Sequence, residues 1–290
     1  MKNILIIGAN GFTGRRILND LSVNPIYHVT GCSLRDDICP GKDYRFVRTD
    51  IRDENEVRKL FKECRPDIVI NTSALSVPDY CETHHAEAEA TNVTAVETIA
   101  HVCEQYGSRF IHLSTDFVFD GKSTRLYKEE DEAIPVNYYG VTKLKAEKII
   151  ASICSNYAIV RVVVVYGKAL PGQHGNILQL VANRLRNGET IRVVSDQWRT
   201  PTFVGDISVG VEKLMFHTAN GIYHICGSEC LTIAEIAYRV ADFLKLDRSL
   251  IEPVTTEEMK ETTPRPRFSG LSIEKAKAEI GYTPRTLEEG

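Results

Sequence analysis

A short apolar run leads directly into three closely spaced glycines at the start of the chain. The run "ILII" has the content of a buried strand, "GANGFTG" follows it with glycines at 8, 11 and 14, and "TGRRILNDLSV" then shows helical spacing. A strand that turns through such glycines into a helix is the pattern of a dinucleotide-binding loop. Gly8 would make the tight turn, Gly11 would let the backbone approach a pyrophosphate, and Gly14 would let the helix pack close to the sheet. Free N–H groups at the helix N-terminus would meet the phosphate charge.

Apolar runs and helical patterns alternate over the first 167 residues. The runs "HVTGCS", "DIVINTSA", "RFIHLST" and "AIVRVVVVYG" have little internal alternation, and helical patterns separate them. Such runs predict parallel strands that are buried on both faces of a sheet. We therefore predict an α/β fold, a Rossmann-type doubly wound parallel sheet with a second, smaller substrate-binding lobe.

The regular alternation ends after Gly167. "GNILQLVANRLRNG" predicts a helix, and a later helix opens with the capping box Thr232-Ile-Ala-Glu235. "VGDISVGVEKLMF" and "GIYHICG" are predicted to return to the first sheet. The predicted division assigns residues 1–167 plus 204–227 to a dinucleotide-binding Rossmann domain, and residues 168–203 plus 228–290 to the substrate-binding lobe.

The end of the second predicted strand decides which dinucleotide fits. An NAD site usually has an acidic residue there, which accepts hydrogen bonds from the ribose 2′-hydroxyl. This chain has "GCSLRDD", with Ser33 and Arg35 in that region. A guanidinium can bind a 2′-phosphate through two hydrogen bonds, and the serine can donate another. NADP(H) is therefore the predicted cofactor, while the two aspartates that follow keep NAD(H) open as the alternative.

Candidate reacting residues lie at the end of a later predicted strand and on the helix that follows. "HLSTDFVFDG" ends an apolar strand at Thr115, and in "NYYGVTKLKAE" Tyr139 and Lys143 are four apart, which places them on one helical face. Ligands bind at the carboxyl ends of the strands in open parallel sheets. Hydride addition to a carbonyl carbon builds negative charge on the oxygen, and an aligned acid must then supply a proton.

A tyrosine needs a neighbouring cation to serve as this acid. Its pKa of about 10 would have to fall by ~3 units, which needs roughly 4 kcal/mol, and an ammonium about 4 Å away supplies that much at an effective dielectric of ~20. Lys143 is the predicted cation, Tyr139 the predicted proton donor, and Thr115 the hydroxyl that holds the carbonyl. An ordinary amphipathic helix start after a strand-end turn would show the same residues. The glycine loop upstream favours the catalytic interpretation.

Composition and charge argue against several other classes of protein. The 290 residues carry a formal net charge of −4 without a block of one sign, so we expect no nucleic-acid partner and no membrane partner. Eight cysteines without a CxxC pair indicate buried thiols in a reducing compartment, and the opening apolar run is too short for a signal peptide. A cytoplasmic location is predicted. His84 and His85 are adjacent and cannot chelate in the usual i, i+4 manner, so no metal site is expected.

The chain also resembles the extended short-chain dehydrogenase/reductase superfamily, and within it the dTDP-4-dehydrorhamnose reductase group. The motifs that carry the resemblance occur in order: "GANGFTG", "NTSALSVPDYCE", "LSTDFVFDG", "EEDEAIPVNYYGVTKLKAE", "RVVVVYG", "VVSDQWRTPTFVGDI" and "RPRFSGLS". The resemblance implies NADPH-dependent reduction of the 4-keto group of a dTDP-6-deoxy-4-keto-hexose, giving dTDP-L-rhamnose. The group's catalytic threonine, tyrosine and lysine fall on Thr115, Tyr139 and Lys143.

The predictions from the residues and from the resemblance together define two sets of contacts. The expected cofactor set is Gly8, Asn10, Gly11, Phe12, Thr13, Gly14, Ser33, Arg35, Asp50, Ile51, Ser73, Ala74, Asn92, Tyr139 and Lys143. The expected substrate set, for a nucleotide sugar, is Ser76, Asp116, Phe117, Asn176, Trp198 and Arg199. Two departures remove substrate-side contacts: Phe117 stands where the group has the tyrosine of "STDYVF", and Val164 stands where it has a tryptophan before "VYG".

A second relative within the same group gives a different prediction. The regulatory β subunit of methionine adenosyltransferase is similar in "GCSLR", "DQWRTPT" and "PRPR", and Arg199, where reductases usually have a glycine, favours it too. The alternative is thus an NADP-binding regulatory subunit without turnover that assembles with a partner enzyme. A homodimer is the other assembly left open. A nucleotide-sugar epimerase that retains NAD is a third alternative, against which Ser33 and Arg35 argue.

Overall fold

One parallel sheet forms the centre of the larger lobe. The computed structural model describes residues 1–41, 43–173 and 175–290. In the 7-stranded sheet the order is β11-β6-β5-β4-β1-β2-β3, and each neighbouring pair is parallel. The bounds are β1 Lys2–Ile7, β2 Tyr27–Ser33, β3 Arg45–Arg48, β4 Ile68–Asn71, β5 Arg109–Thr115, β6 Tyr157–Val162 and β11 Gly221–His224. The predicted doubly wound α/β fold is confirmed.

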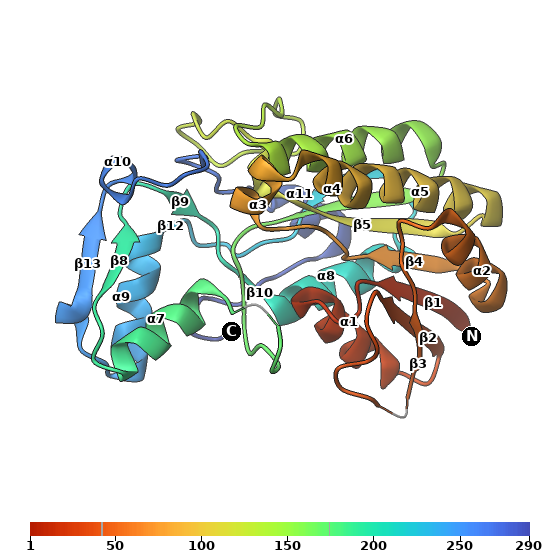
Figure 1. Cartoon of the computed structure of the whole chain (residues 1–290), viewed down its shortest axis with the longest axis horizontal. Coiled ribbons are helices and arrows are strands. Elements are labelled where there is room, and N and C mark those ends of the chain that lie inside the picture. Colours follow the sequence, from red (N-terminus) through yellow and green to blue (C-terminus); the bar gives the residue numbers. More distant parts are fainter. Residues whose placement is uncertain (42, 174) are drawn as a thin grey trace.

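Helices cover both faces of this sheet, because its strands are apolar on both sides (Figure 1). On β1, Ile4 and Ile6 belong to the core shared with α1 (Phe12–Ser22), α8 (Val204–Phe216) and α11 (Glu274–Ile280). Leu5 and Ile7 belong to the core shared with α2 (Glu54–Cys64), α5 (Ala95–Tyr106) and α6 (Tyr138–Ile153). Successive side chains of a strand point to opposite faces, so both sets are buried.

The chain between β4 and the end of α5 is helical over nearly the range that the sequence predicts, from about Ala86 to Tyr106. The short helix α3 (Pro78–Thr83) precedes this range. Within this range α4 (His85–Glu89) passes through a π-helical turn η1 (Ala90–Thr94) into α5, and the turn is the feature that the sequence does not predict. Such turns are frequent at functional sites. Here η1 brings Asn92 against the loop that follows β4.

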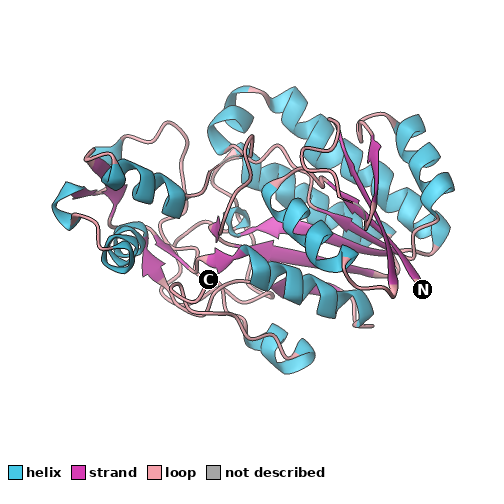
Figure 2. Cartoon of the chain, turned by 90° about the horizontal axis from the view of Figure 1, so that it is seen from below, coloured by secondary structure: helices cyan, strands magenta, loops and turns pink. Residues whose placement is uncertain are grey.

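The smaller lobe lies at the end of the sheet away from the N-terminus (Figures 1 and 2). Helices α7 (Ile177–Arg186) and α9 (Ile233–Leu244) share a core with the parallel strands β8 (Ile191–Val194) and β13 (Ile251–Val254). The predicted capping box at Thr232 begins α9. The short elements are η2 Asp116–Val118, β7 Val165–Tyr166, β9 Trp198–Arg199, β10 Thr202–Phe203, β12 Leu231–Thr232, η3 Arg248–Leu250 and α10 Thr256–Met259.

The last part of the chain packs on the larger lobe. Leu271, Ile273, Ala276 and Tyr282 belong to the same core as β1 and α8, although the predicted division places them with the smaller lobe. Strand β11 pairs with β6, so α8 and β11 complete the first sheet and its cover. No helix in the described residues is both long and apolar enough to span a membrane.

Candidate active site

The glycine loop is shaped by two close backbone approaches. Gly8 has φ of +82°, and a Cβ there would lie 2.7 Å from the backbone nitrogen of Ser73. A Cβ on Gly14 would overlap the carbonyl oxygen of Gly8, so only glycine lets α1 start this close to the sheet. Gly11 is the N-cap of α1, with no side-chain cap and no acidic residue in the first turn. The first N–H groups of α1, near Phe12 and Thr13, therefore suit an anion.

A cleft of about 360 Å³ lies along this loop. Seven residues of the predicted cofactor set line it: Gly8, Gly11, Ser33, Asp50, Ile51, Ser73 and Ala74. The lining also includes Thr72, Leu75, Arg52, Glu87 and Thr91, which the sequence patterns did not single out. The carboxyl ends of β1, β2 and β4 thus contribute to one elongated site, as expected for an open parallel sheet.

Asn10 holds the loop after β2 in place. Its Nδ2 donates to the carbonyl oxygens of Arg35 (3.2 Å) and Asp36 (2.9 Å), and its Oδ1 accepts from Arg15 (2.8 Å). The buried Arg15 also pairs with Asp37. Asn10 therefore has its side chain committed to this loop. The Arg35 side chain is exposed and is not among the described residues that line the cleft.

Two further members of the cofactor set bind other protein groups. Asp50 pairs with Arg52 at 2.7 Å, and hydrogen bonds from Arg52 lower the pKa of the Asp50 carboxyl. Asn92 accepts from the backbone N–H of Leu75 (2.8 Å) and donates to its carbonyl oxygen (3.0 Å). It donates as well to the hydroxyl of Thr142 on α6. Asn92 thereby fixes the cleft-lining loop after β4 relative to the helix that holds Tyr139.

Thr115 and Tyr139 lie close together where β5 meets the start of α6, and Lys143 follows one helical turn farther on. Thr115 is the last residue of β5, and Tyr139 lies in the first turn of α6, which Asn137 caps by accepting from Gly140 N (2.9 Å). A Cβ on Gly140 would overlap the carbonyl oxygen of Phe117. Gly140 thus lets the helix approach the strand end closely, where the Thr115 hydroxyl donates to Asp116 Oδ1 (3.1 Å) and lowers the pKa of the nearby Tyr139 phenol.

The expected lowering of the Tyr139 pKa is not seen in the chain alone. Burial raises the pKa of the phenol, and the nearby Asp116 carboxylate raises it further, while the hydrogen bond with Thr115 lowers it. The Lys143 Nζ donates to the carbonyl oxygen of Leu113 at 2.6 Å and lies 2.8 Å from Nε2 of His112. The lysine therefore binds β5 rather than the phenol, which explains why it does not offset the effect of burial.

Burial also governs the charge of Lys143, which is 2% exposed. It lowers the pKa of the lysine to about 8, and the Glu147 carboxylate on the same helix opposes this shift. Glu147 is itself buried and pairs with Arg161 of β6 at 2.7 Å. It also accepts a hydrogen bond from Ser114. His112 and Ser114 share one face of β5, and Lys143 and Glu147 share one face of α6, so the two faces meet through polar pairs.

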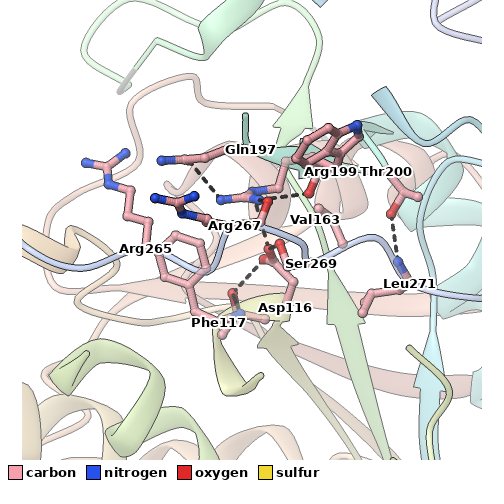
Figure 3. A network of polar contacts seen from close by, with 12 residues as sticks. Asp116, Phe117, Val163, Gln197, Arg199, Thr200, Arg265, Arg267, Ser269 and Leu271 are labelled. Carbon is pink, nitrogen blue, oxygen red and sulfur yellow. Dashed lines mark hydrogen bonds and ion pairs between the residues drawn. The ribbon is translucent and has the colours of Figure 1, made fainter. Parts of the chain in front are cut away.

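Asp116 and Arg199 bind each other on the side toward the smaller lobe (Figure 3). The Arg199 Nε lies 3.8 Å from Oδ2 of Asp116, and its terminal nitrogens donate to the Trp198 carbonyl (2.8 Å) and to Gln197 Oε1 (3.1 Å). Ser269 donates to the same carboxylate. Both charged side chains are buried, and burial raises the pKa of Asp116 despite the arginine. Their polar atoms are thus committed within the protein.

The other residues of the predicted substrate set are dispersed. Phe117 packs edge-on against Tyr139, with ring centroids 5.9 Å apart. Asn176 makes a capping box at the start of α7 and donates to the Gly167 carbonyl (2.8 Å). It lines a cavity of about 380 Å³ between α7 and α9, whose described lining includes neither Thr115 nor Tyr139. Ser76 is exposed in the loop after β4, and Trp198 is exposed on β9. In the described residues no cluster of side chains suited to a metal ion occurs.

The structure adds residues that sequence patterns alone did not indicate. His112 lies inside an apolar strand, Asn71 is the last residue of another, and Gly140 lies inside a helix, so none of them interrupts the pattern of its element. The available signal was the strand period of 2, which places His112 on the same face as Ser114, next to a helix with Lys143 and Glu147 at i, i+4.

A doubly wound sheet with a glycine-loop cleft at the carboxyl ends of its strands is the architecture of the NAD(P)-dependent oxidoreductases with a Rossmann fold. Within this class, the chain belongs to the family described as RmlD substrate binding domain, which matches residues 1–290.

Comparisons with individual proteins support both relatives that the sequence suggests. The chain is 32% identical over 291 residues to the spore coat polysaccharide biosynthesis protein SpsK of Bacillus subtilis, covering 100% of this chain and 95% of that protein. It is 31% identical over 290 residues to methionine adenosyltransferase 2 subunit beta of Xenopus laevis, covering 98% and 84%. A solved dTDP-4-dehydrorhamnose reductase from Bacillus anthracis in complex with NADP is similar with a TM-score of 0.87 at 26% identity, covering 100% and 97%. The resemblance to this reductase group is confirmed.

Proposed function

We propose that the chain uses NADPH to reduce the 4-keto group of a nucleotide-linked 6-deoxyhexose, with dTDP-4-dehydrorhamnose as the substrate and dTDP-L-rhamnose as the product. The observation that carries this proposal is the meeting of Thr115 and Tyr139 at the carboxyl end of β5, with Lys143 one helical turn on. The NADP found with the Bacillus anthracis relative supports the cofactor.

The residues present fit a dinucleotide. The overlaps at Gly8 and Gly14 leave room for backbone only, and the N-terminus of α1 has no side-chain cap, as binding of a pyrophosphate requires. Ser33 lines the cleft, and Arg35 follows it on the loop that Asn10 holds. When bound, the nicotinamide ring supplies the hydride.

In the proposed reaction the protein supplies the proton and orients the ketone. The raised pKa keeps the Tyr139 phenol protonated at neutral pH, so it has a proton to donate as negative charge grows on the carbonyl oxygen. Thr115 donates a hydrogen bond to the same oxygen, and the Lys143 ammonium stabilises the phenolate left after transfer. Lysine is charged only below its pKa of about 8, so the reduction is expected to slow above that pH.

A turnover assay tests this function. Purified protein with NADPH and dTDP-4-dehydrorhamnose should oxidise NADPH in step with formation of dTDP-L-rhamnose, followed by absorbance and by chromatography of the sugar nucleotide. Consumption of NADPH with another keto-sugar only would keep the reductase and correct the substrate. Tight NADPH binding with no turnover of any keto-sugar would contradict the proposal.

The second candidate function is an NADP-binding regulatory subunit. It is favoured by the 31% identity to methionine adenosyltransferase 2 subunit beta and by Arg199, whose side chain fills the space beside Asp116. Co-purification with a methionine adenosyltransferase catalytic subunit and a change in that enzyme's kinetics would support it. An epimerase, the third alternative, would interconvert sugars without net oxidation of the cofactor.

The cofactor preference has its own test. Replacing Arg35 with alanine should weaken NADPH binding by about tenfold or more and leave NADH binding nearly unchanged, because only NADPH has a 2′-phosphate. Isothermal titration with both cofactors measures the two dissociation constants. Arg192, exposed on β8 of the smaller lobe, provides a matched surface arginine whose alanine variant should bind both cofactors as the wild type does. Equal losses for both cofactors in the Arg35 variant would contradict the assignment.

A further inference from the structure

A chain of hydrogen bonds links the cofactor cleft to Lys143. Ser73, which lines the cleft, donates from its backbone N–H (3.0 Å) and from its hydroxyl (2.6 Å) to Oδ1 of Asn71. Asn71 Nδ2 lies 3.2 Å from Nδ1 of His112, and His112 Nε2 lies 2.8 Å from Lys143 Nζ. Asn71, His112 and Lys143 are all buried. The side-chain polar atoms of these three residues are therefore shielded from bulk water, whereas Ser73 borders the cleft.

The direction of these bonds fixes the ring proton of His112. A backbone N–H can only donate, so the Asn71 oxygen must face Ser73 and its NH₂ group must face His112. Nδ1 of the ring is then an acceptor, and a neutral imidazole carries its one proton on Nε2. Burial holds the pKa of His112 well below its ordinary value, so the ring is neutral. Its Nε2–H therefore points at the Lys143 nitrogen.

An N–H donor pointing at this nitrogen favours an uncharged amine over an ammonium. A neutral amine has a lone pair that accepts from Nε2–H, and it can still donate to the Leu113 carbonyl oxygen at 2.6 Å. An ammonium has donors only, and would require the ring to turn or to move its proton to Nδ1. Either change leaves Asn71 or Ser73 without a partner in a buried site, which costs free energy.

We propose that His112 is a positioning residue for Lys143: with its ring proton set by Asn71 and Ser73, it holds the amine in place and opposes its protonation. The titratable groups that face the lysine are Glu147 from its own helix, whose carboxylate favours the ammonium, and the neutral His112 from β5, whose Nε2–H disfavours it. Only the predicted effect of His112 on turnover rests on the proposed function. The state of the lysine can be measured without any reaction.

Nuclear magnetic resonance of the cofactor-free protein tests the proposal directly. Long-range ¹H–¹⁵N spectra of histidine-labelled protein should show His112 as the Nε2–H tautomer at neutral pH, assigned by its loss in His112→Gln. The ¹³Cε signal of Lys143, assigned with Lys143→Gln, should titrate well below the ordinary lysine pKa of about 10.4. In His112→Gln the amide oxygen can accept from an ammonium, so the midpoint should rise by about one pH unit or more.

Two controls separate this role from general disturbance of the core. His224→Gln changes another buried histidine, on β11, and should leave the Lys143 midpoint unchanged. If His112→Gln does not fold, Asn71→Asp replaces the NH₂ group with an acceptor of the same shape and should convert the ring to the Nδ1–H tautomer while raising the midpoint.

The outcomes distinguish this inference from the proposed function. An Nδ1–H tautomer in the wild type, or a Lys143 midpoint that neither His112→Gln nor Asn71→Asp moves, would overturn the inference. If the protein reduces keto-sugars, the alkaline limb of its kcat/KM profile should move upward by a similar amount in His112→Gln. Absence of turnover in every variant, with the expected spectra, would remove the proposed function and leave the role of His112 standing.

Discussion

At the scale of single residues, Tyr139 has the most demanding role in the proposed reaction, because it must donate the proton. It is partly buried, with its pKa raised by burial and by Asp116, so the phenol is fully protonated at neutral pH. The raised pKa keeps the proton on the phenol but also makes it a weak acid, so proton transfer requires a cation that stabilises the phenolate. Lys143 is the cation in reach of that helical face. The proposed reaction therefore needs both residues, Tyr139 to donate the proton and Lys143 to stabilise the phenolate.

Replacing Tyr139 with phenylalanine tests the role of its hydroxyl as the proton donor. The ring stays and only the hydroxyl is lost, so the rate of reduction should fall by ~100-fold or more because general acid catalysis is removed. NADPH binding, measured by titration calorimetry, should stay within a few-fold of the wild type. Tyr138→Phe, the adjacent tyrosine that approaches Glu89 instead, is the matched control and should keep its rate. Full activity in Tyr139→Phe would remove the tyrosine from the mechanism.

At the scale of elements, the contact between β5 and α6 sets the geometry of the site. Gly140 is buried where the first turn of α6 crosses the carbonyl oxygen of Phe117, and Asn137 caps the helix at that point. Farther along the same interface, the Ser114–Glu147–Arg161 cluster and the His112–Lys143 pair fix the register of helix on strand. The position of Tyr139 is thus determined by the contacts at the start of α6 and by the polar pairs farther along this helix.

Gly140→Ala should therefore displace the start of α6. Overpacking at a buried backbone contact costs about 1–3 kcal/mol, and a shift of about 1 Å at Tyr139 should lower the rate by about 100-fold. Urea unfolding and turnover measure the two effects. Gly175→Ala is the matched control, because its Cβ would meet only Gln179 Oε1 at 3.6 Å and its stability should hardly change. A stable and fully active Gly140→Ala variant would show that the contact does not position the tyrosine.

The pairing of β11 with β6 makes stability depend on pH. His224 is buried opposite Arg161, and burial followed by the Arg161 charge lowers its pKa from 6.5 to about 3. A histidine with a lowered folded-state pKa binds its proton more readily in the unfolded chain. Its contribution is therefore fully present above pH 6.5 and is lost progressively as the pH falls toward about 3.

His224→Gln should remove this part of the pH dependence. Below pH 6.5 one such group costs about 1.4 kcal/mol per pH unit, so the drop in unfolding free energy between pH 7 and pH 5 should be smaller by about 2 kcal/mol in the variant. Urea unfolding at both pH values gives the difference, and any loss common to both cancels. His101→Gln on the exposed side of α5 is the control and should keep the wild-type difference. An unchanged difference in His224→Gln would contradict the assignment.

At the scale of the whole molecule, local spacing predicts the fold and part of the site, and tertiary pairing decides the rest. The glycine loop and the apolar strands can be recognised from residues that are close together in the sequence. The overlaps that a Cβ at Gly8 or Gly14 would make match the roles predicted for these two glycines. The π-helical turn at 90–94 leaves the periodicity of its helix almost unchanged, so the sequence does not reveal it. The partners of Asn10, Asn92 and Arg199 are set by loops that come together only in the folded chain.

The Asp116–Arg199 pair connects the two lobes, because Asp116 follows β5 and Arg199 lies on β9 (Figure 3). Ser269, on the returning C-terminal segment, donates to the same carboxylate. Both charges are buried, so each depends on the other for compensation. Removing both partners should therefore cost less than the sum of the two single losses.

A double-mutant cycle with Asp116→Asn and Arg199→Met tests this connection. Each single change leaves an uncompensated buried charge or its unpaired donors and should lower the unfolding free energy by about 3 kcal/mol, while the double variant should lose clearly less than the sum. Urea unfolding of the four proteins gives the coupling energy. The exposed pair Glu54–Arg58 on α2, at 2.7 Å, is the matched control, and its coupling should stay below about 0.5 kcal/mol because water screens both charges. Additive losses at Asp116 and Arg199 would mean that the lobes are held together by apolar packing and backbone bonds, and that this pair serves the ligand site alone.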